Sequence, residues 1–165
     1  MAESENNARR WASLVNPDRE TLARLLHAGA FATALVAVGD PWDRVGRGWD
    51  AVVIAPLARG LAALDVLGLS ADEGYPLIAD HSRSELIVLC RRGVAAGVFA
   101  AGPQGVRVLT SESYLLVPSG QWGGYPAAWL NRPQTVASAR YVDPAELREA
   151  LLCAEVRRAA GLFSR

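Results

Sequence analysis

Apolar and polar positions alternate along this chain with periods that predict helices at both ends and strands between them. Two N-terminal helices are predicted within residues 5–33. In the second, Asn16 serves as the cap and Leu22 and Leu26 recur at helical spacing on one apolar face. The apolar run 34–38 fits both the end of this helix and a first strand, because periodicity does not separate the two in so short a segment.

Runs that are rich in β-branched residues predict a sheet in the middle of the chain. The run 49–54 is stopped by Pro56, and a helix is predicted over 57–67, where Gly68 ends it. Further strands are predicted over residues 75–79, 85–90, 106–109, 114–117 and 127–130.

The connections between these elements predict the fold class. The polar turn 110–113 indicates a hairpin in which 114–117 pairs with 106–109, and Asp143 begins a capping sequence for a last helix over 144–160. A helix, then a strand, a helix, several strands and a helix is the order expected of an α+β fold. We therefore predict a largely antiparallel sheet with helices packed mainly on one side, as a single domain over residues 1–165.

Composition narrows the possible partners. Seventeen basic residues balance seventeen acidic ones, so no overall field attracts nucleic acid, and a protein partner is favoured. Every basic residue is arginine, which excludes lysine chemistry such as a Schiff base. No apolar run is long enough for a membrane span, and no secretory signal begins the chain, so we expect a cytoplasmic protein without a membrane partner.

Four segments of the chain, in order, carry a resemblance to a known family. They are residues 46–50 leading through Pro56 into a helix, Tyr75–Leu77 with the turn 80–83, the strand 114–119 followed by Tyr125 and Trp129, and the helix start at 141–144. Residues 46–155 thereby resemble the N-terminal primase-polymerase domain of bacterial bifunctional DNA primase/polymerases, in the archaeo-eukaryotic primase superfamily, and especially its short, divergent actinobacterial versions. The resemblance implies a primase-polymerase-like fold.

The same resemblance shows which catalytic groups are missing. Active members use two acids on one strand, a histidine on a second and an acid on a third to hold divalent metals and the nucleotide. Only Asp50 matches, while the histidine position falls near Leu86 and the third acid aligns with Arg107. A guanidinium about 4 Å from a divalent metal costs on the order of 8 kcal/mol at an effective dielectric near 20. We therefore expect no catalytic residue, metal or cofactor, with Asp50, Arg107 and Glu112 as the remnant of a cleft.

A glycine-rich loop carries the aromatic side chains that could bind a partner. Trp122 and Tyr125, with Arg132 and the turn residue Arg83, form the predicted binding surface, because exposed aromatics stack on bases or anchor protein partners. The last helix is apolar over a wide arc, which favours a homodimer through it. We thus expect an inactive, regulatory protein-binding module; the alternatives are a residual metal-dependent nucleotide-binding enzyme and a single-stranded nucleic-acid binder.

Overall fold

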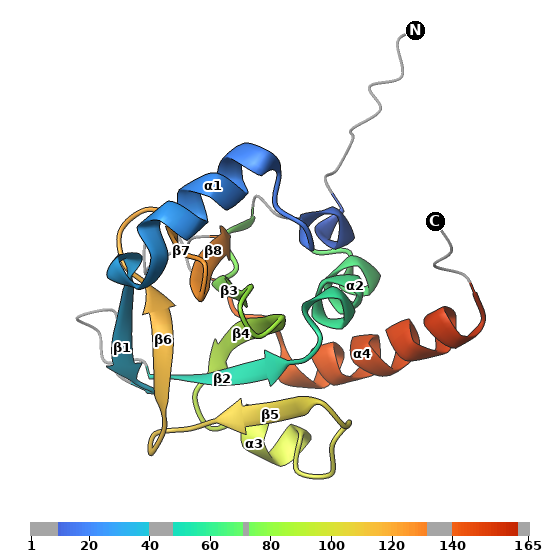
Figure 1. Ribbon diagram of the computed structural model, residues 1–165. Coiled ribbons are helices and arrows are strands. Elements are labelled where there is room, and N and C mark those ends of the chain that lie inside the picture. The colour runs from blue at the N-terminus through green and yellow to red at the C-terminus, as the bar shows by residue number, and fades with distance from the viewer. Residues whose placement is uncertain (1–9, 40–47, 71–72, 132–139, 162–165) are drawn as a thin grey trace, which may run out of the picture.

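The computed structural model describes residues 10–39, 48–70, 73–131 and 140–161. Four α-helices and eight strands make up these parts of the chain (Figure 1). The helices are α1 (Arg19–Ala28), α2 (Leu57–Leu67), α3 (Ala95–Val98) and α4 (Pro144–Ala159), with two 3-10 turns, η1 (Trp11–Leu14) and η2 (Gly29–Ala32). The strands are β1 (Thr33–Ala37), β2 (Trp49–Ile54), β3 (Leu77–Asp80), β4 (Glu85–Arg91), β5 (Val106–Leu109), β6 (Tyr114–Pro118), β7 (Gly123–Gly124) and β8 (Ala127–Asn131).

The strands form two antiparallel sheets. The larger sheet has six strands in the order β5-β2-β4-β3-β8-β7, and the smaller is the two-stranded ribbon β1-β6. In β2 every residue is buried, because strands flank it on both edges and other elements cover both faces. The prediction of an α+β fold with a mainly antiparallel sheet is confirmed.

One face of the large sheet is covered by helices. Leu61 and Leu64 of α2 and Leu147 and Leu151 of α4 recur at helical spacing, and all four are fully buried in the core beneath these helices. Gly60 lets α2 approach closely, since a Cβ atom built there would lie 2.6 Å from the Leu86 side chain. The helices α2 and α4 lie side by side over this face (Figure 1).

The opposite face of the large sheet is covered by the ribbon. Trp49, Val53 and Ile87 point to this side and pack with Val38 and Leu115 in a second core. Helix α1 does not lie on the face that α2 and α4 cover; it is placed over the ribbon and β7 (Figure 1). The expected placement of helices on one side of the sheet therefore holds for α2 and α4 and not for α1.

Three local predictions change in the structure. The run 34–38 belongs mainly to strand β1, which settles the open alternative. Helix α1 is capped by Asp18, whose side chain accepts hydrogen bonds from the backbone N–H and the hydroxyl of Thr21, so Asn16 is not the cap. The predicted hairpin between 106–109 and 114–117 is wrong: β5 pairs with β2, and β6 crosses to the other layer and pairs with β1.

Candidate functional site

The side chain of Asp50 lies on the helix-covered face of the large sheet. It stands opposite Cys90 in the β2–β4 register and is buried, and its Oδ2 accepts a hydrogen bond of 2.7 Å from the backbone N–H of Gly93. Burial, with smaller contributions from the charges of Asp50 and Asp143, raises the pKa of the Cys90 thiol to about 12. Asp50 thus fixes the turn after β4, and its carboxylate faces a thiol that stays protonated.

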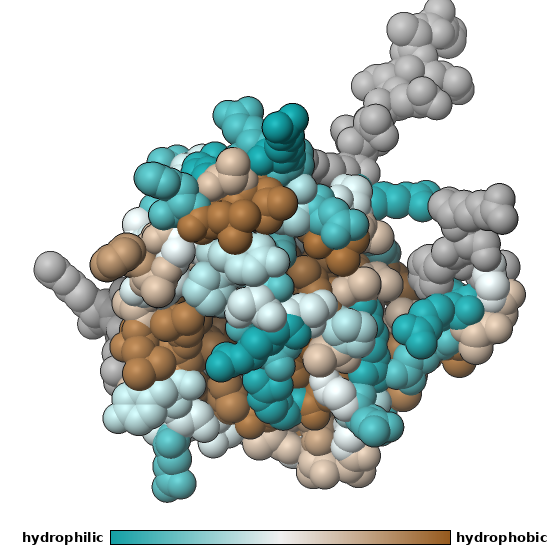
Figure 2. Space-filling model, in the orientation of Figure 1, coloured by the Kyte–Doolittle hydropathy of each residue, from teal (hydrophilic) through white to brown (hydrophobic). Residues whose placement is uncertain are grey.

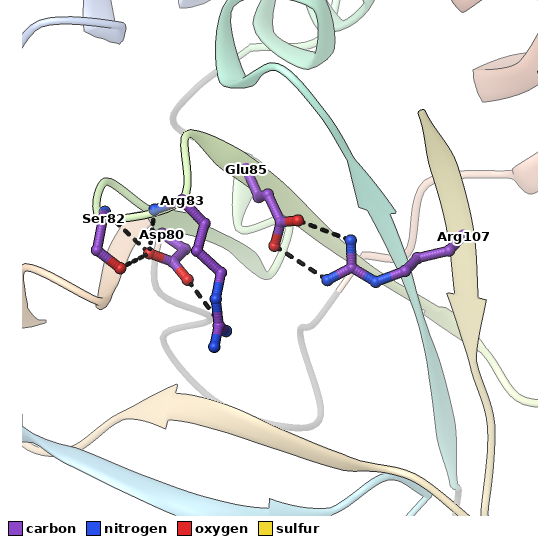
Figure 3. A network of polar contacts seen from close by, with 5 residues as sticks. All are labelled: Asp80, Ser82, Arg83, Glu85 and Arg107. Carbon is purple, nitrogen blue, oxygen red and sulfur yellow. Dashed lines mark hydrogen bonds and ion pairs between the residues drawn. The ribbon is translucent and has the colours of Figure 1, made fainter. Parts of the chain in front are cut away.

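Arg107 lies on the opposite face of the same sheet. It stands across from Val53 in β5, and its guanidinium reaches over β2 to Glu85 at the start of β4 (Figure 3). Two hydrogen bonds of 2.6 and 3.0 Å join the two side chains in a forked ion pair. The hydrogen bond to Glu85 is the main cause that raises the pKa of Arg107. The guanidinium therefore neutralises a carboxylate of this chain.

The three residues that we predicted as a remnant cleft are not brought together. Asp50 and Val53 are three positions apart in one strand, so their side chains point to opposite faces, and Arg107 shares the face of Val53. Glu112 lies in the exposed turn between β5 and β6. A single substrate cannot contact the carboxylate of Asp50 and the guanidinium of Arg107 across a closed sheet.

A pocket of about 400 Å³ opens elsewhere, where α1 and η1 meet the end of the large sheet. Its walls come from four regions, namely η1, the start of α1, the turn after β3 and the β7–β8 segment; the residues are Ser13, Leu14, Asn16, Pro17, Asp18, Thr21, Arg24, Leu25, His81, Trp122, Ala128, Trp129 and Leu130. The lining mixes apolar and aromatic side chains with polar ones, and two of its residues, Asp18 and Arg24, carry a charge. Such a mixture is typical of ligand sites, in which apolar contact gives affinity and a few polar groups give orientation.

Trp122 forms the exposed rim of this pocket. Its side chain is 49% exposed, and the guanidinium carbon of Arg24 lies 4.6 Å from the centre of its ring, which is a cation–π contact. The backbone of Trp122 is fixed as well, because its carbonyl accepts a hydrogen bond of 3.1 Å from the backbone N–H of Trp129. A largely exposed indole is therefore held in one position beside a cavity.

Tyr125 connects α1 to the floor of the pocket. Its backbone N–H donates to the carbonyl of Leu25 in α1, and its carbonyl accepts a bond of 3.1 Å from the N–H of His81. The two rings stack with centroids 5.6 Å apart. Burial lowers the pKa of His81, and the charge of Asp80 opposes this effect, so the imidazole is neutral at physiological pH.

The glycine pair 123–124 brings α1 to this position. A Cβ atom on Gly124 would lie 1.9 Å from the carbonyl oxygen of Gly29, directly after α1, so only a residue without a side chain allows the contact. Gly123 has a φ of +81° and packs against the carbonyl of Ala127. The observed position of α1 therefore requires glycine at both positions.

The predicted binding surface is brought together in part. Trp122 lies on the pocket and Tyr125 stacks beneath it on His81, whereas Arg83 points to solvent with its Nη1 3.7 Å from Oδ2 of Asp80 (Figure 3). Arg132 lies outside the described residues. Arg24 and His81 are the site residues that sequence reasoning missed. Arg24 lies one helical turn after Glu20 and shows no local signal, and His81 was interpreted only as part of a polar turn.

Comparisons of the chain with protein-family models, with curated proteins and with solved structures found no match. The resemblance to primase-polymerase domains therefore stays a prediction. Within the described ranges, no helix has both the length and the apolar character needed to cross a membrane.

Proposed function

We propose that this chain is a regulatory binding module without a catalytic centre, which recognises a protein partner through the pocket beside Trp122. The observation that carries the proposal is the half-exposed indole ring of Trp122, which Arg24 and the Trp129 backbone hold at the rim of a cavity with apolar and polar lining. Aromatic residues in such positions dominate the binding energy of many protein interfaces. We infer that an apolar side chain of the partner enters the pocket.

The arrangement of acids and imidazoles supports binding over catalysis. Asp50 accepts from the backbone of Gly93 and Glu85 is engaged by Arg107, so both carboxylates serve the fold. In the part of the chain that the structure describes, no three His, Cys, Asp or Glu side chains gather closely enough to hold a metal ion. The residual metal-dependent nucleotide enzyme that we kept as an alternative would need such a cluster for phosphoryl transfer.

A protein partner fits the pocket better than a single-stranded nucleic acid does. Non-specific single-strand binders combine stacking aromatics with a positively charged groove that follows the phosphates. Here Arg24 and Asp18 line one cavity and offset each other, and the chain carries no net charge. The remaining lining residues are uncharged side chains and His81, and the apolar ones among them, such as Leu14, Leu25 and Leu130, suit an apolar side chain.

A displayed random peptide library tests the proposal directly. We expect selection on the intact chain to enrich peptides with a common apolar or aromatic position, and calorimetry to measure binding that falls at least tenfold in Trp122→Ala. Tyr114→Ala is the matched control, because this aromatic residue is also largely exposed but does not line the pocket. Enriched peptides that bind equally well to Trp122→Ala, or no enriched peptide at all, would contradict the proposal.

The two alternatives have their own measurements. Metal-dependent binding of a nucleoside triphosphate that is lost in Asp50→Asn would support the enzyme and overturn the proposal. Binding of a fluorescent oligothymidine that weakens steeply with salt and is lost in Trp122→Ala would support the nucleic-acid binder. We expect neither.

A further inference from the structure

The outer edge of strand β1 offers a second surface, separate from the Trp122 pocket. Among the described residues, β1 pairs only with β6, and it lies at the outer side of the ribbon (Figure 1). We propose that this edge pairs antiparallel with β1 of a second copy of the chain, so that two ribbons join into a four-stranded sheet across a twofold axis.

Within the described residues 28–39, the edge has none of the sequence features that normally prevent such pairing. Natural edge strands carry charges, proline or a β-bulge that discourage a further strand from adding. Residues 28–39 contain no charged residue and no proline, and the five pairs between β1 and β6 run in continuous register without a bulge. The backbone groups on the outer side of β1 are therefore presented by a regular, uncharged strand.

Exposed apolar side chains accompany the edge. Phe31, two residues before β1, is 99% exposed, and Leu35 in the centre of the strand is 67% exposed. Apolar side chains gather on this side of the molecule, over α1 and over the ribbon (Figure 2). Full burial of one such side chain contributes roughly 1.5–3 kcal/mol. Leu35 lies on the outer face of the ribbon, so pairing at this edge would place it beside the second copy and cover part of its surface.

A second copy is the occupant that these features favour. A twofold axis places a strand against itself in the antiparallel direction, which is the direction that β1 already uses with β6. Both sides of the contact are then uncharged, so no like charges oppose each other. The chain as a whole has equal numbers of acidic and basic residues, so no long-range repulsion opposes association.

The ribbon edge is favoured over helix α4, which we also considered as a dimer surface. The stripe of α4 that holds Leu147 and Leu151 already packs within the chain. On its outer side α4 exposes Leu152 and Val156, which lie one helical turn apart. Contact through these two side chains would bring no backbone hydrogen bonds, whereas the ribbon edge presents backbone groups as well as an exposed apolar side chain.

The small size of the edge sets the expected strength. The proposed contact is formed mainly by the five residues of β1 from each copy, which is short beside specific interfaces that bury roughly 1,200 Å² or more. We therefore expect a reversible dimer that forms at protein concentrations on the order of 0.1 mM.

Sedimentation velocity from about 0.01 to about 1 mM protein tests this with two lysine variants. Leu35→Lys adds a charge to the edge, and we expect it to stay monomeric across the range while the unchanged protein dimerises. Val156→Lys adds the same charge to α4 and should dimerise like the unchanged protein. Both positions are exposed, and thermal unfolding checks that each variant keeps its fold.

Amide hydrogen exchange identifies the pairing itself. We expect amides of β1 to exchange more slowly as the protein concentration rises through the dimerisation range, while those of α4 do not change. An unchanged protein that stays monomeric throughout, a dimer that persists in Leu35→Lys, or a dimer that is lost only in Val156→Lys would each overturn the proposal.

Discussion

The two faces of the six-stranded sheet bury their apolar residues to very different extents. Under α2 and α4, residues such as Leu61, Leu64 and Leu151 are fully buried, and both helices present their apolar stripes to the sheet. On the other side, the ribbon covers a second core but leaves Phe31 and Leu35 in water. We call the helix-covered face the closed side, because its apolar residues are buried. We call the ribbon-covered face the open side, because it leaves apolar side chains exposed to water.

This difference separates residues that maintain the fold from residues that are available for contacts. Asp50, which we expected in a functional cleft, lies on the closed face and serves a turn. The outer edge of β1 belongs to the open side, and Trp122 lies where α1 and η1 meet the end of the sheet. Neither proposal depends on Asp50 or on the helices α2 and α4, so mutations under those helices should differ in kind from mutations at the two proposed surfaces.

The largest contrast is expected between two leucine truncations. Leu61→Ala removes side-chain volume from the closed core and should lower the free energy of unfolding by about 2–5 kcal/mol. Leu35→Ala on the exposed side should change it by less than about 0.5 kcal/mol at low protein concentration. Urea unfolding measures both values. Equal losses would mean that the ribbon is as closed as the helix-covered face.

A glycine substitution tests how tightly α1 is held on the open side. Gly124→Ala places a methyl group against the backbone of Gly29, which cannot move aside, and should cost about 1–3 kcal/mol. Gly97→Ala is the matched control, because nothing lies within 4 Å of its Cβ position. Hydrogen exchange should show faster exchange in α1 than in α4 for the first variant only. Equal changes of exchange rate in α1 and α4 would show that Gly124 does not hold α1 locally.

The sequence alone indicates the closed side well. Helix α2 was predicted with its observed bounds because Pro56 and Gly68 delimit it and its leucines recur at one period. The cap of α4 was equally readable, since the Asp143 side chain accepts from two backbone N–H groups at the helix start. Local signals were sufficient where propensity, periodicity and packing agree.

The open side was read less well because its contacts are long-range. The turn after β5 has the composition of a hairpin, yet the inward side chains Leu115 and Val117 draw β6 to β1, far away in the sequence. The pocket joins residues that are far apart in the sequence, so the pairing of Arg24 with Trp122 has no local signal. Whether two strand residues share a face depends on register, which decides that Asp50 and Arg107 point apart.

A smaller effect is expected from the forked ion pair at the edge of the second core. A double-mutant cycle with Arg107→Met and Glu85→Gln should give a coupling energy of about 1 kcal/mol, because two charge-assisted hydrogen bonds join a guanidinium that is 52% exposed. The coupling should decrease as salt is added. A coupling near zero would show that solvent screens the pair completely.

The smallest effect concerns the pH dependence of the pocket. Folding lowers the pKa of His81. As the pH falls below about 6.5, this imidazole is therefore protonated in the unfolded chain before it is protonated in the folded protein. The stability contribution of the neutral imidazole is complete above this pH and decreases as the pH falls toward the folded pKa. His81→Gln should lose less stability between pH 7 and pH 5 in thermal unfolding. An identical loss in both proteins would exclude His81 as a cause.

The backbone of Tyr125 has a mechanical consequence for recognition. Its N–H donates to the carbonyl of Leu25 in the last turn of α1, and its carbonyl accepts from the N–H of His81, which lines the pocket. A displacement of α1 is therefore transmitted to the imidazole through two hydrogen bonds and a stacked ring. If a partner occupies the pocket as we propose, its binding is coupled to the anchoring of α1, and we expect this helix to be more rigid in the complex.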